Sequence, residues 1–199
     1  MLPTAVFQGD PLDCAIRMVG TTLIWGRCSG VVVECEAYLT ENDEACHTFS
    51  RASTRSFVER NGPGAIYIYL NYGIHWMLNV LVKGGPRSGL ILVRAIEPRL
   101  GIASMQRRRG TDDVRRLCSG PGKLTQALDI THRHHELSMC FSSRRCLVEA
   151  KQTAKVIASP RIGITRSADL PWRFTLENSP FVSVPVKNDA NQMITATLG

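Results

Sequence analysis

Two short stretches of the sequence combine acidic, aromatic and amide side chains at close spacing. The first is Glu34-Cys35-Glu36-Ala37-Tyr38, with His47 nine residues further on. The second runs from Tyr67 to Asn79 and contains three tyrosines. A carboxylate can deprotonate water for attack on a sugar carbon, and aromatic rings can stack on a nucleobase. Together the stretches indicate cleavage of the bond between a sugar and a stacked base.

Glu36 lies in the middle of the apolar segment 31–39, whose β-branched residues favour a strand. Side chains alternate along a strand, so Glu34, Glu36 and Tyr38 are expected on one side. Arg94, in another apolar segment, could pair with Glu36 and hold it ionised as a general base. Glu34 is a rival on the same face, and the spacing from Tyr38 only mildly favours Glu36. The plain alternative is an acid on an edge strand that faces solvent.

Tyr38, His47 and Tyr69 supply flat, electron-rich rings that can stack on a base, and more strongly on a cationic one. Each ring alone is more simply explained by a tyrosine-rich sheet surface or a surface histidine. Three rings around one acid favour a base-binding pocket. Asn79 would then be a polar group on the pocket floor that screens bases by their edge hydrogen bonds. Otherwise it is an ordinary strand residue.

Tyr72 precedes Gly73 at the expected turn between two strands, where a bulky ring is poorly placed for a core. Such a ring suits a wedge that enters a duplex from the minor groove and replaces an extruded base. We assign Ile74, next along the turn, to the same DNA-contacting surface. A solvent-exposed turn tyrosine is the alternative.

The elements that must position these residues are mostly strands. A helix should begin with Asp10 as N-cap and Pro11 as its first residue, and should carry apolar residues from Leu12 to Leu23 on one face. Further helices are expected at 100–109 and 123–128, and a long polar loop at 40–64. Strands are expected at 31–39, 65–70, 74–82, 89–96, 146–149, 155–158, 173–176 and 181–184. We therefore predict one α+β domain over residues 1–199, with a polar tail that frays from about residue 187.

The charge balance favours a polyanionic partner. The 199 residues carry 24 Lys and Arg against 17 Asp and Glu, a formal charge of +7. Three arginine groups could grip phosphates, or equally be solvated faces or complement helix C-termini: 107–109, 115–116 and 144–145. No apolar run approaches the length of a membrane span, and the first residues do not resemble a signal peptide. A cytoplasmic protein is expected, associated with the nucleoid if the source is bacterial.

The seven cysteines are odd in number and none has C-x-x-C spacing, so we expect reduced thiols that are mostly buried. His132, His134 and His135 with Cys140 and Cys146 match no standard zinc spacing, and a polar loop is expected there. No metal or other cofactor is predicted. Motifs for nucleotide hydrolysis, dinucleotide redox chemistry and zinc proteolysis are absent from the sequence.

Six ordered segments resemble the alkyladenine (3-methyladenine) DNA glycosylases, which are base-excision repair enzymes, and look close to their prokaryotic branch. They are VECEAYL (33–39), DEACH (43–47), GAIYIY (64–69), YGIHW (72–76), LVRAIEP (92–98) and CSGPGKL (118–124), with weaker similarity at 161–164 and 179–183. Six motifs in order over nearly the whole chain are far more specific than one. The segment 48–61 departs from the family, whose members usually have Thr-Pro-Arg-Asn there; only Thr54-Arg55 is retained.

The resemblance implies a role for each candidate residue. By it, Glu36 is the general base and Arg94 its partner at the water and the backbone phosphate. The remaining assignments are Tyr38, His47 and Tyr69 around the flipped base, Tyr72 as the intercalating residue, and Asn79 as the group that discriminates against the guanine amino group. The family needs no metal. Its fold is a single mixed domain with a central, mostly antiparallel curved sheet, flanking helices and a protruding β-hairpin.

We therefore predict a monofunctional DNA glycosylase that flips alkylated purines from duplex DNA and hydrolyses the N-glycosidic bond, leaving an abasic site. Double-stranded DNA with damaged purines is the expected partner, and a monomer with no obligatory protein partner is expected. Two alternatives stay open. One is a non-catalytic damage-binding protein with the same pocket, and the other is a nucleoside hydrolase that needs neither Tyr72 nor the positive charge.

Overall fold

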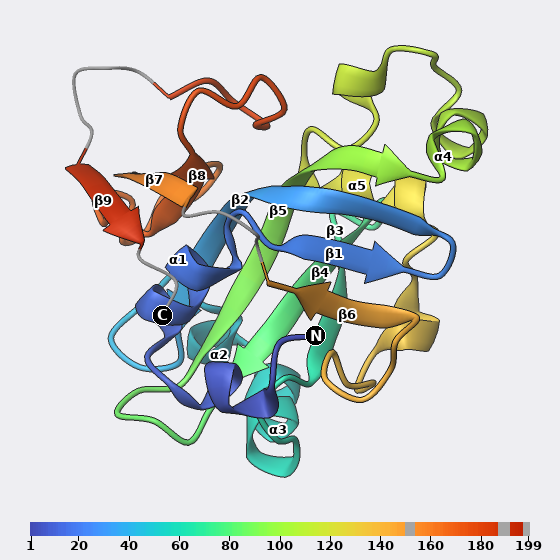
Figure 1. Ribbon diagram of the computed structural model, residues 1–199. Helices are drawn as coiled ribbons and strands as arrows, with labels where there is room; N and C mark the ends of the chain where they lie inside the picture. The colour runs from blue at the N-terminus through green and yellow to red at the C-terminus, as the bar shows by residue number, and fades with distance from the viewer. Residues whose placement is uncertain (150–153, 187–191, 197–199) are drawn as a thin grey trace.

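A curled antiparallel sheet runs through the computed structural model, which describes residues 1–149, 154–186 and 192–196 (Figure 1). The elements in chain order are η1 (Thr4–Gln8), α1 (Pro11–Met18), β1 (Thr22–Trp25), β2 (Cys28–Leu39), α2 (His47–Ser50), α3 (Ala52–Arg60), β3 (Ile66–Asn71), β4 (His75–Val82), β5 (Gly89–Leu100), α4 (Ile102–Arg109), η2 (Val114–Arg116), α5 (Pro121–Leu128), η3 (His132–His134), β6 (Arg145–Val148), β7 (Ala154–Ser159), β8 (Arg173–Leu176) and β9 (Gln192–Ala196).

The strands follow the order β3-β4-β5-β2-β8-β7-β9, and β1 pairs with both β2 and β6. All the described strand pairs are antiparallel. Helix α1 packs on β2 and β5, and α5 packs on β4, β5 and α4 (Figure 1). The predicted α+β class, with a mostly antiparallel curved sheet and flanking helices, is confirmed.

Strands β2 and β5 form the centre of the sheet and share an irregularity at the residues of interest. The register shifts on both sides of Glu34, so Val33 on β2 and Arg94 on β5 have no partner directly opposite. Such bulges bend a strand and re-aim its side chains. They bring the side chain of Arg94 to the side of β2 that carries Glu34 and Glu36.

The hairpin of β3 and β4 pairs from Ile66↔Val80 to Asn71↔His75. Its turn is closed by a hydrogen bond of 3.0 Å that the Ile74 N–H donates to the Asn71 carbonyl. Tyr72 and Gly73 both have positive φ, at 50° and 69°. Turns with this backbone match the right-handed twist of the flanking strands, and glycine favours them at the second position. The expected hairpin with Tyr72 at its tip is therefore confirmed.

The core lies against the sheet and beneath α1, α4 and α5. Side chains with no exposed surface there include Phe7, Met18, Leu23, Leu78, Ile91 and Leu124. All seven cysteines are buried and free, as expected for small apolar residues. None of the helices in the described parts of the chain has the length and apolar character needed to span a bilayer.

The expected helix from Asp10 is shorter than predicted. Asp10 caps α1 through a hydrogen bond of 2.9 Å from the Leu12 N–H, but the helix ends at Met18. Gly20 follows with a φ of 89°, which a continuing helix does not allow. Leu23 therefore lies in β1, not on the helix.

Two other expected segments are also wrong. The supposed loop 40–64 contains α2 and α3, and the supposed strand 181–184 forms turns and bends instead. Pro180 and Pro185 flank this last segment, and proline cannot donate to a strand ladder. The predicted fraying tail falls partly on 187–191 and 197–199, which lie outside the described residues. Between them, β9 pairs with β7.

Candidate active site

A cavity of about 320 Å³ opens beside the central strands and collects most of the predicted site residues. Those that line it are Tyr38, His47, Tyr69, Tyr72, Asn79 and Arg94. Two others do not line it: Glu36 lies directly behind the wall, and Ile74 lies on the hairpin tip beside a neighbouring hollow. The volume is near the lower end of the range for small-molecule sites, roughly 300–1,000 Å³.

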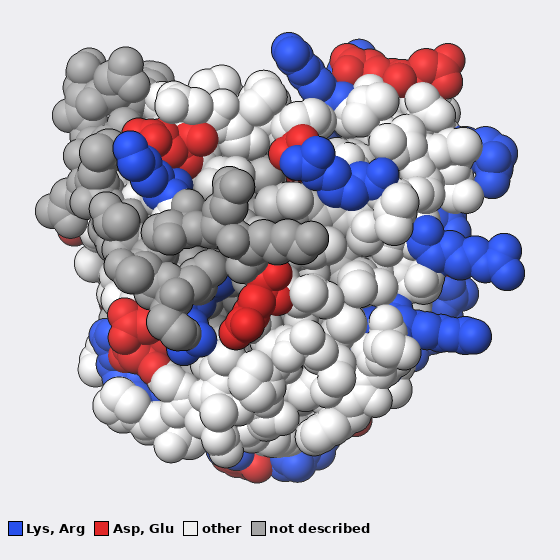
Figure 2. All heavy atoms as spheres, in the orientation of Figure 1, with Lys and Arg blue, Asp and Glu red and all other residues white. Residues whose placement is uncertain are grey.

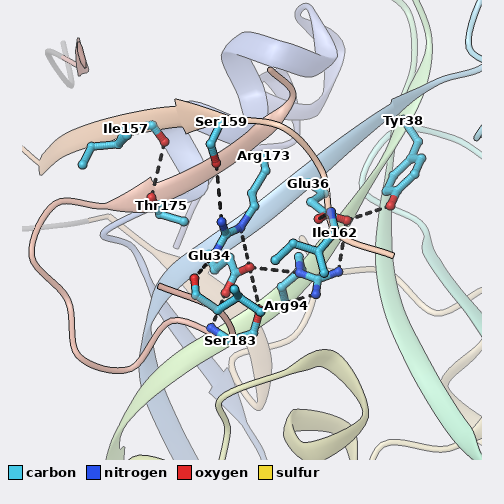
Figure 3. A network of polar contacts seen from close by, with 11 residues as sticks. Glu34, Glu36, Tyr38, Arg94, Ile157, Ser159, Ile162, Arg173, Thr175 and Ser183 are labelled. Carbon is cyan, nitrogen blue, oxygen red and sulfur yellow. Dashed lines mark hydrogen bonds and ion pairs between the residues drawn. The ribbon is translucent and has the colours of Figure 1, made fainter. Parts of the chain in front are cut away.

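Glu36 has no exposed surface, and three residues that line the cavity hold its carboxylate. The Tyr38 hydroxyl donates to Oε2 at 2.7 Å, and Arg94 Nη1 donates to the same oxygen at 3.1 Å. The Ile162 N–H donates to Oε1 at 2.8 Å (Figure 3). The expected ion pair between Glu36 and Arg94 is thus present.

Glu34 is equally buried but is enclosed on a different side (Figure 3). Its Oε1 accepts hydrogen bonds from Arg94 Nε at 3.0 Å and from Arg173 Nε at 2.8 Å. Ser183 adds its hydroxyl to Oε1 at 2.8 Å and its N–H to Oε2 at 2.6 Å. Neither Arg173 nor Ser183 lines the cavity. Glu34 therefore anchors the chain segment around Ser183 to the sheet.

Arg94 is shared between the two carboxylates and is only 7% exposed. Burial opposes the charge of a guanidinium, but the negative charges of Glu36 and then Glu34 raise the pKa of Arg94. Arg94 therefore stays positively charged at the edge of the cavity.

Tyr38 and Tyr69 are neutral in the cavity wall. Burial, followed by the charge of Glu36, raises the pKa of Tyr38 well above its ordinary value. Burial also raises the pKa of Tyr69 to about 12. Near neutral pH both rings keep their hydroxyl protons, so Tyr38 can donate to Glu36.

His47 begins α2 and turns its ring toward the tyrosines of β3. The ring centroids of His47 and Tyr69 are 4.3 Å apart at an interplanar angle of 69°. Burial, followed by the positive charge of Arg51, lowers the pKa of His47 to about 4. The imidazole is therefore neutral at physiological pH and adds an uncharged ring to the cavity wall.

Asn79 lies on β4, is 3% exposed and lines the cavity. Its Nδ2 donates to the carbonyl of Tyr67 at 3.3 Å and, more weakly, to that of Met77 at 3.5 Å. These contacts fix the plane of the amide. Asn79 is thus a buried polar group among the aromatic residues that line the cavity.

The hairpin tip extends the cavity wall into solvent. Tyr72 is 86% exposed and Ile74 is 72% exposed, which is unusual for large apolar side chains. A non-glycine residue with positive φ is also uncommon, and such backbone is often found at functional sites. The tip therefore presents two apolar side chains that no other part of the described chain covers.

Comparisons with known proteins show which family this chain belongs to. The family model for methylpurine-DNA glycosylase (MPG) matches residues 5–180. The chain belongs to the methylpurine-DNA glycosylase family. It is therefore a DNA glycosylase, a hydrolase of N-glycosyl bonds that acts on DNA in base excision repair.

Three relatives of this glycosylase each carry the name "Putative 3-methyladenine DNA glycosylase". The one from Rhodopseudomonas palustris strain CGA009 is 42% identical over 173 residues, which cover 87% of this chain and 83% of the relative. The one from Nitrosospira multiformis is 40% identical over 185 residues, or 93% and 95% of the two chains. The one from Granulibacter bethesdensis is 44% identical over 185 residues, or 92% and 87%.

Sequence reasoning missed two parts of the candidate site. Tyr67 lines the cavity, and its hydroxyl lies 2.8 Å from the Thr54 hydroxyl and 3.4 Å from His47 Nδ1. Its place two residues before Tyr69 on one strand could have indicated this. Ile162 holds Glu36 through its backbone N–H, and no side-chain pattern signals such a donor.

The basic groups of this glycosylase divide between structural and exposed roles. Figure 2 shows Lys and Arg side chains along the right-hand edge of one face, from the place of α4 in Figure 1 down past the turn between β1 and β2. Within that helix, Arg108 donates to the Ala127 carbonyl at 2.8 Å, and Arg109 donates to the Leu117 carbonyl at 3.2 Å. Both arginines thus help to tie α4 to its neighbours. In the described part of the chain, no group of three His, Cys, Asp or Glu side chains is arranged to hold a metal ion.

Proposed function

We propose that this glycosylase flips alkylated purines, 3-methyladenine among them, out of duplex DNA and hydrolyses the N-glycosidic bond with water activated by Glu36. One observation carries the proposal. The fully buried carboxylate lies directly behind an aromatic cavity and is held by three residues that line it. A carboxylate is costly to bury unless it is paired or used. The names of the relatives supply the substrate class.

The carboxylate of Glu36 retains capacity for a further hydrogen bond. An ionised carboxylate has about four lone-pair sites, and the three donors from Tyr38, Arg94 and Ile162 use three of them. A water molecule that donates to the remaining site would be oriented for attack on C1′ of the everted nucleotide. Glu36 takes the proton, the hydroxyl oxygen bonds to C1′, and the electron pair of the glycosidic bond leaves with the base. The negative charge also stabilises the oxocarbenium-like transition state.

The cavity suits a cationic purine. Alkylation at N3 or N7 gives the base a positive charge, and it leaves as a neutral molecule, so a single carboxylate suffices. Tyr38 and Tyr69 offer electron-rich faces to that charge. His47 does not repel it, because a pKa of about 4 leaves the imidazole uncharged at neutral pH.

Asn79 would screen bases at the floor of the cavity. Because its amide nitrogen already donates to the Tyr67 carbonyl, the group is held in one orientation. A fixed amide at this depth would leave no room for an exocyclic amino group at the 2-position of a bound purine. We propose that undamaged guanine is excluded by this contact.

The hairpin tip would open the duplex. Tyr72, which lines the cavity, and Ile74, on the same hairpin tip, are both exposed, and inserting an aromatic wedge fills the space left by an everted base. Unstacking costs a few kcal/mol and costs least at damaged pairs. The formal charge of +7 would supply the attraction to phosphates, so binding should weaken steeply as salt rises. The cavity is built from one chain, and we propose that the protein acts as a monomer.

The test is an excision assay on duplex DNA that contains 3-methyladenine. The native protein should release the base and leave abasic sites without cutting the backbone. Glu36→Gln keeps the size of the side chain but cannot accept a proton from water. The rate of 3-methyladenine release should therefore fall by about 10²- to 10⁴-fold. Release by this variant at the native rate would overturn the assignment. Strand cleavage by the native protein would contradict the monofunctional reaction.

A further inference from the structure

Arg161 is a buried cation for which the mechanism above has no role. Its side chain has no exposed surface, and it does not line the cavity. It precedes Ile162, whose N–H holds the Glu36 carboxylate at 2.8 Å. A buried charge is expensive unless it is paired and hydrogen-bonded, so its partners indicate what it does.

The guanidinium of Arg161 joins three segments of the chain. It forms a bidentate pair with Asp43, with Nη1 donating to Oδ2 at 2.6 Å and Nη2 donating to Oδ1 at 2.8 Å. The same two nitrogens also donate to the Ala37 carbonyl at 3.0 Å and to the Ser167 carbonyl at 3.1 Å. Ala37 lies on β2 next to Glu36, so the pair is attached to the strand that carries the carboxylate.

The Arg161 guanidinium lies over two aromatic rings. Its central carbon is 4.6 Å from the ring centroid of Tyr38 and 5.1 Å from that of Trp172. Its buried Nε has no hydrogen-bond acceptor among the described residues. The position of this guanidinium is therefore fixed by its contacts with the two rings as well as by the carboxylate of Asp43. The contact fixes the ring of Tyr38, whose hydroxyl donates to Glu36.

Asp43 extends the same unit to the segment that leads into α2. Its Oδ2 accepts the Leu39 N–H and its Oδ1 accepts the Ala45 N–H, each at 3.1 Å. These bonds fold the chain between the end of β2 and α2, where His47 begins the helix. The position of His47 therefore depends on the carboxylate that Arg161 holds.

We propose that Arg161 and Asp43 form a positioning unit that holds Tyr38, His47 and the Ile162 N–H in place around Glu36 without contacting the substrate. The inference rests on the proposed function, because it takes Glu36 to be the group that activates water. Reacting groups must be held to within about 0.5 Å, and a displacement of about 1 Å can cost about 100-fold in rate. A unit that sets two cavity walls and one donor to the carboxylate should therefore control the chemical step.

The decisive variant is Arg161→Lys. Lysine keeps the charge that Asp43 needs, but it can neither form the bidentate pair nor stack on the two rings. The single-turnover rate of 3-methyladenine release, measured per folded molecule, should fall by about 10- to 100-fold. Affinity for the lesion duplex should fall less than the rate does. Leu23→Ala, a core truncation on β1, is the control for lost stability and should keep the native rate per folded molecule.

The outcomes separate this proposal from the proposed function. If Arg161→Lys keeps the native rate while Glu36→Gln is inactive, the positioning unit is refuted and the role of Glu36 stands. If Glu36→Gln also keeps the native rate, the proposed function itself fails. Should Arg161→Lys not fold, Trp172→Leu removes one stacking ring and leaves the ion pair with Asp43 in place. A reduced rate per folded molecule would then support the proposal, and a native rate would overturn it.

Discussion

Glu34 and Glu36 lie two residues apart on β2, are both fully buried and share Arg94, yet their surroundings differ. Glu34 accepts four hydrogen bonds, two from Ser183 and one each from Arg94 and Arg173, and neither Ser183 nor Arg173 lines the cavity. Glu36 accepts three, all from residues that line the cavity. Two identical side chains on one strand face therefore differ in whether all of their donors line the cavity.

This contrast assigns Glu34 to the stability of the fold and Glu36 to the chemical step. Glu34 holds the chain around Ser183 to the sheet, so replacing Glu34 should lower the free energy of unfolding. The donors to Glu36 line the cavity, so replacing Glu36 should lower the rate of base excision. Arg94 pairs with both carboxylates.

The largest expected effect on stability comes from Glu34→Gln. The change leaves Arg173 buried without its carboxylate, and removing one partner of a buried ion pair costs about 3–5 kcal/mol. Urea unfolding should reveal the loss. Glu97→Gln, in a more exposed pair with Arg99, is the control and should cost no more than about 1 kcal/mol. Equal losses for both variants would refute the structural role of Glu34.

A smaller effect is expected from Tyr38→Phe, which keeps the ring and removes the donor to Glu36. A hydrogen bond to a charged group is worth about 1.5–3 kcal/mol, so the excision rate should fall by about 10- to 100-fold. Tyr67→Phe is the matched control, because its hydroxyl contacts Thr54 and His47 instead of the carboxylate. If the single-turnover excision rate falls by the same factor in both variants, the hydrogen bond from Tyr38 to Glu36 does not contribute specifically to the reaction.

Tyr72→Ala tests whether the hairpin tip beside the cavity contributes to the binding of duplex DNA. Loss of one aromatic stacking contact is worth about 1–3 kcal/mol, so capture of a lesion in duplex DNA should weaken by about 10-fold or more. Binding of the same lesion in a single strand should change less, because no gap needs to be filled. Equal weakening on both substrates, measured by fluorescence anisotropy, would argue against a wedge.

The smallest effect concerns the pH dependence of stability at His47. Its pKa is about 4 in the folded protein against an ordinary value of 6.5, so the unfolded chain binds the proton more readily. The neutral ring should therefore stabilise the fold above pH 6.5, and this contribution should be lost as the pH falls toward 4. Melting temperatures across this range should decline less for His47→Gln than for the native protein. If the melting temperatures of the two proteins fall in parallel with pH, His47 does not contribute to the pH dependence of stability.

Much of the sheet and most of the site could be predicted from the sequence. Alternation over 31–39 correctly placed Glu34, Glu36 and Tyr38 on one side, because side-chain direction along a strand is a local property. The hairpin around Tyr72 followed from its turn residues. The cost of burying a charge indicated that Arg94 could pair with Glu36, and the structure contains this ion pair.

The failures have a common physical origin in contacts between distant segments. Helix α3 has few apolar residues and is anchored by the buried Phe57, so its periodicity is weak in the sequence. Segment 181–184 has the composition of a strand, but the N–H and hydroxyl of Ser183 bind Glu34. The backbone N–H of Ile162 reaches Glu36 across 126 residues of chain, and no local pattern reveals such a contact.

The central claim, that Glu36 and not Glu34 activates water, is tested most directly by comparing Glu36→Gln with Glu34→Gln. The measurement is the single-turnover release of 3-methyladenine from duplex DNA, expressed per folded molecule. Our account predicts a loss of about 10²- to 10⁴-fold for Glu36→Gln, with Glu34→Gln much closer to the native rate. A native rate for Glu36→Gln, or an equal loss for folded Glu34→Gln, would contradict it.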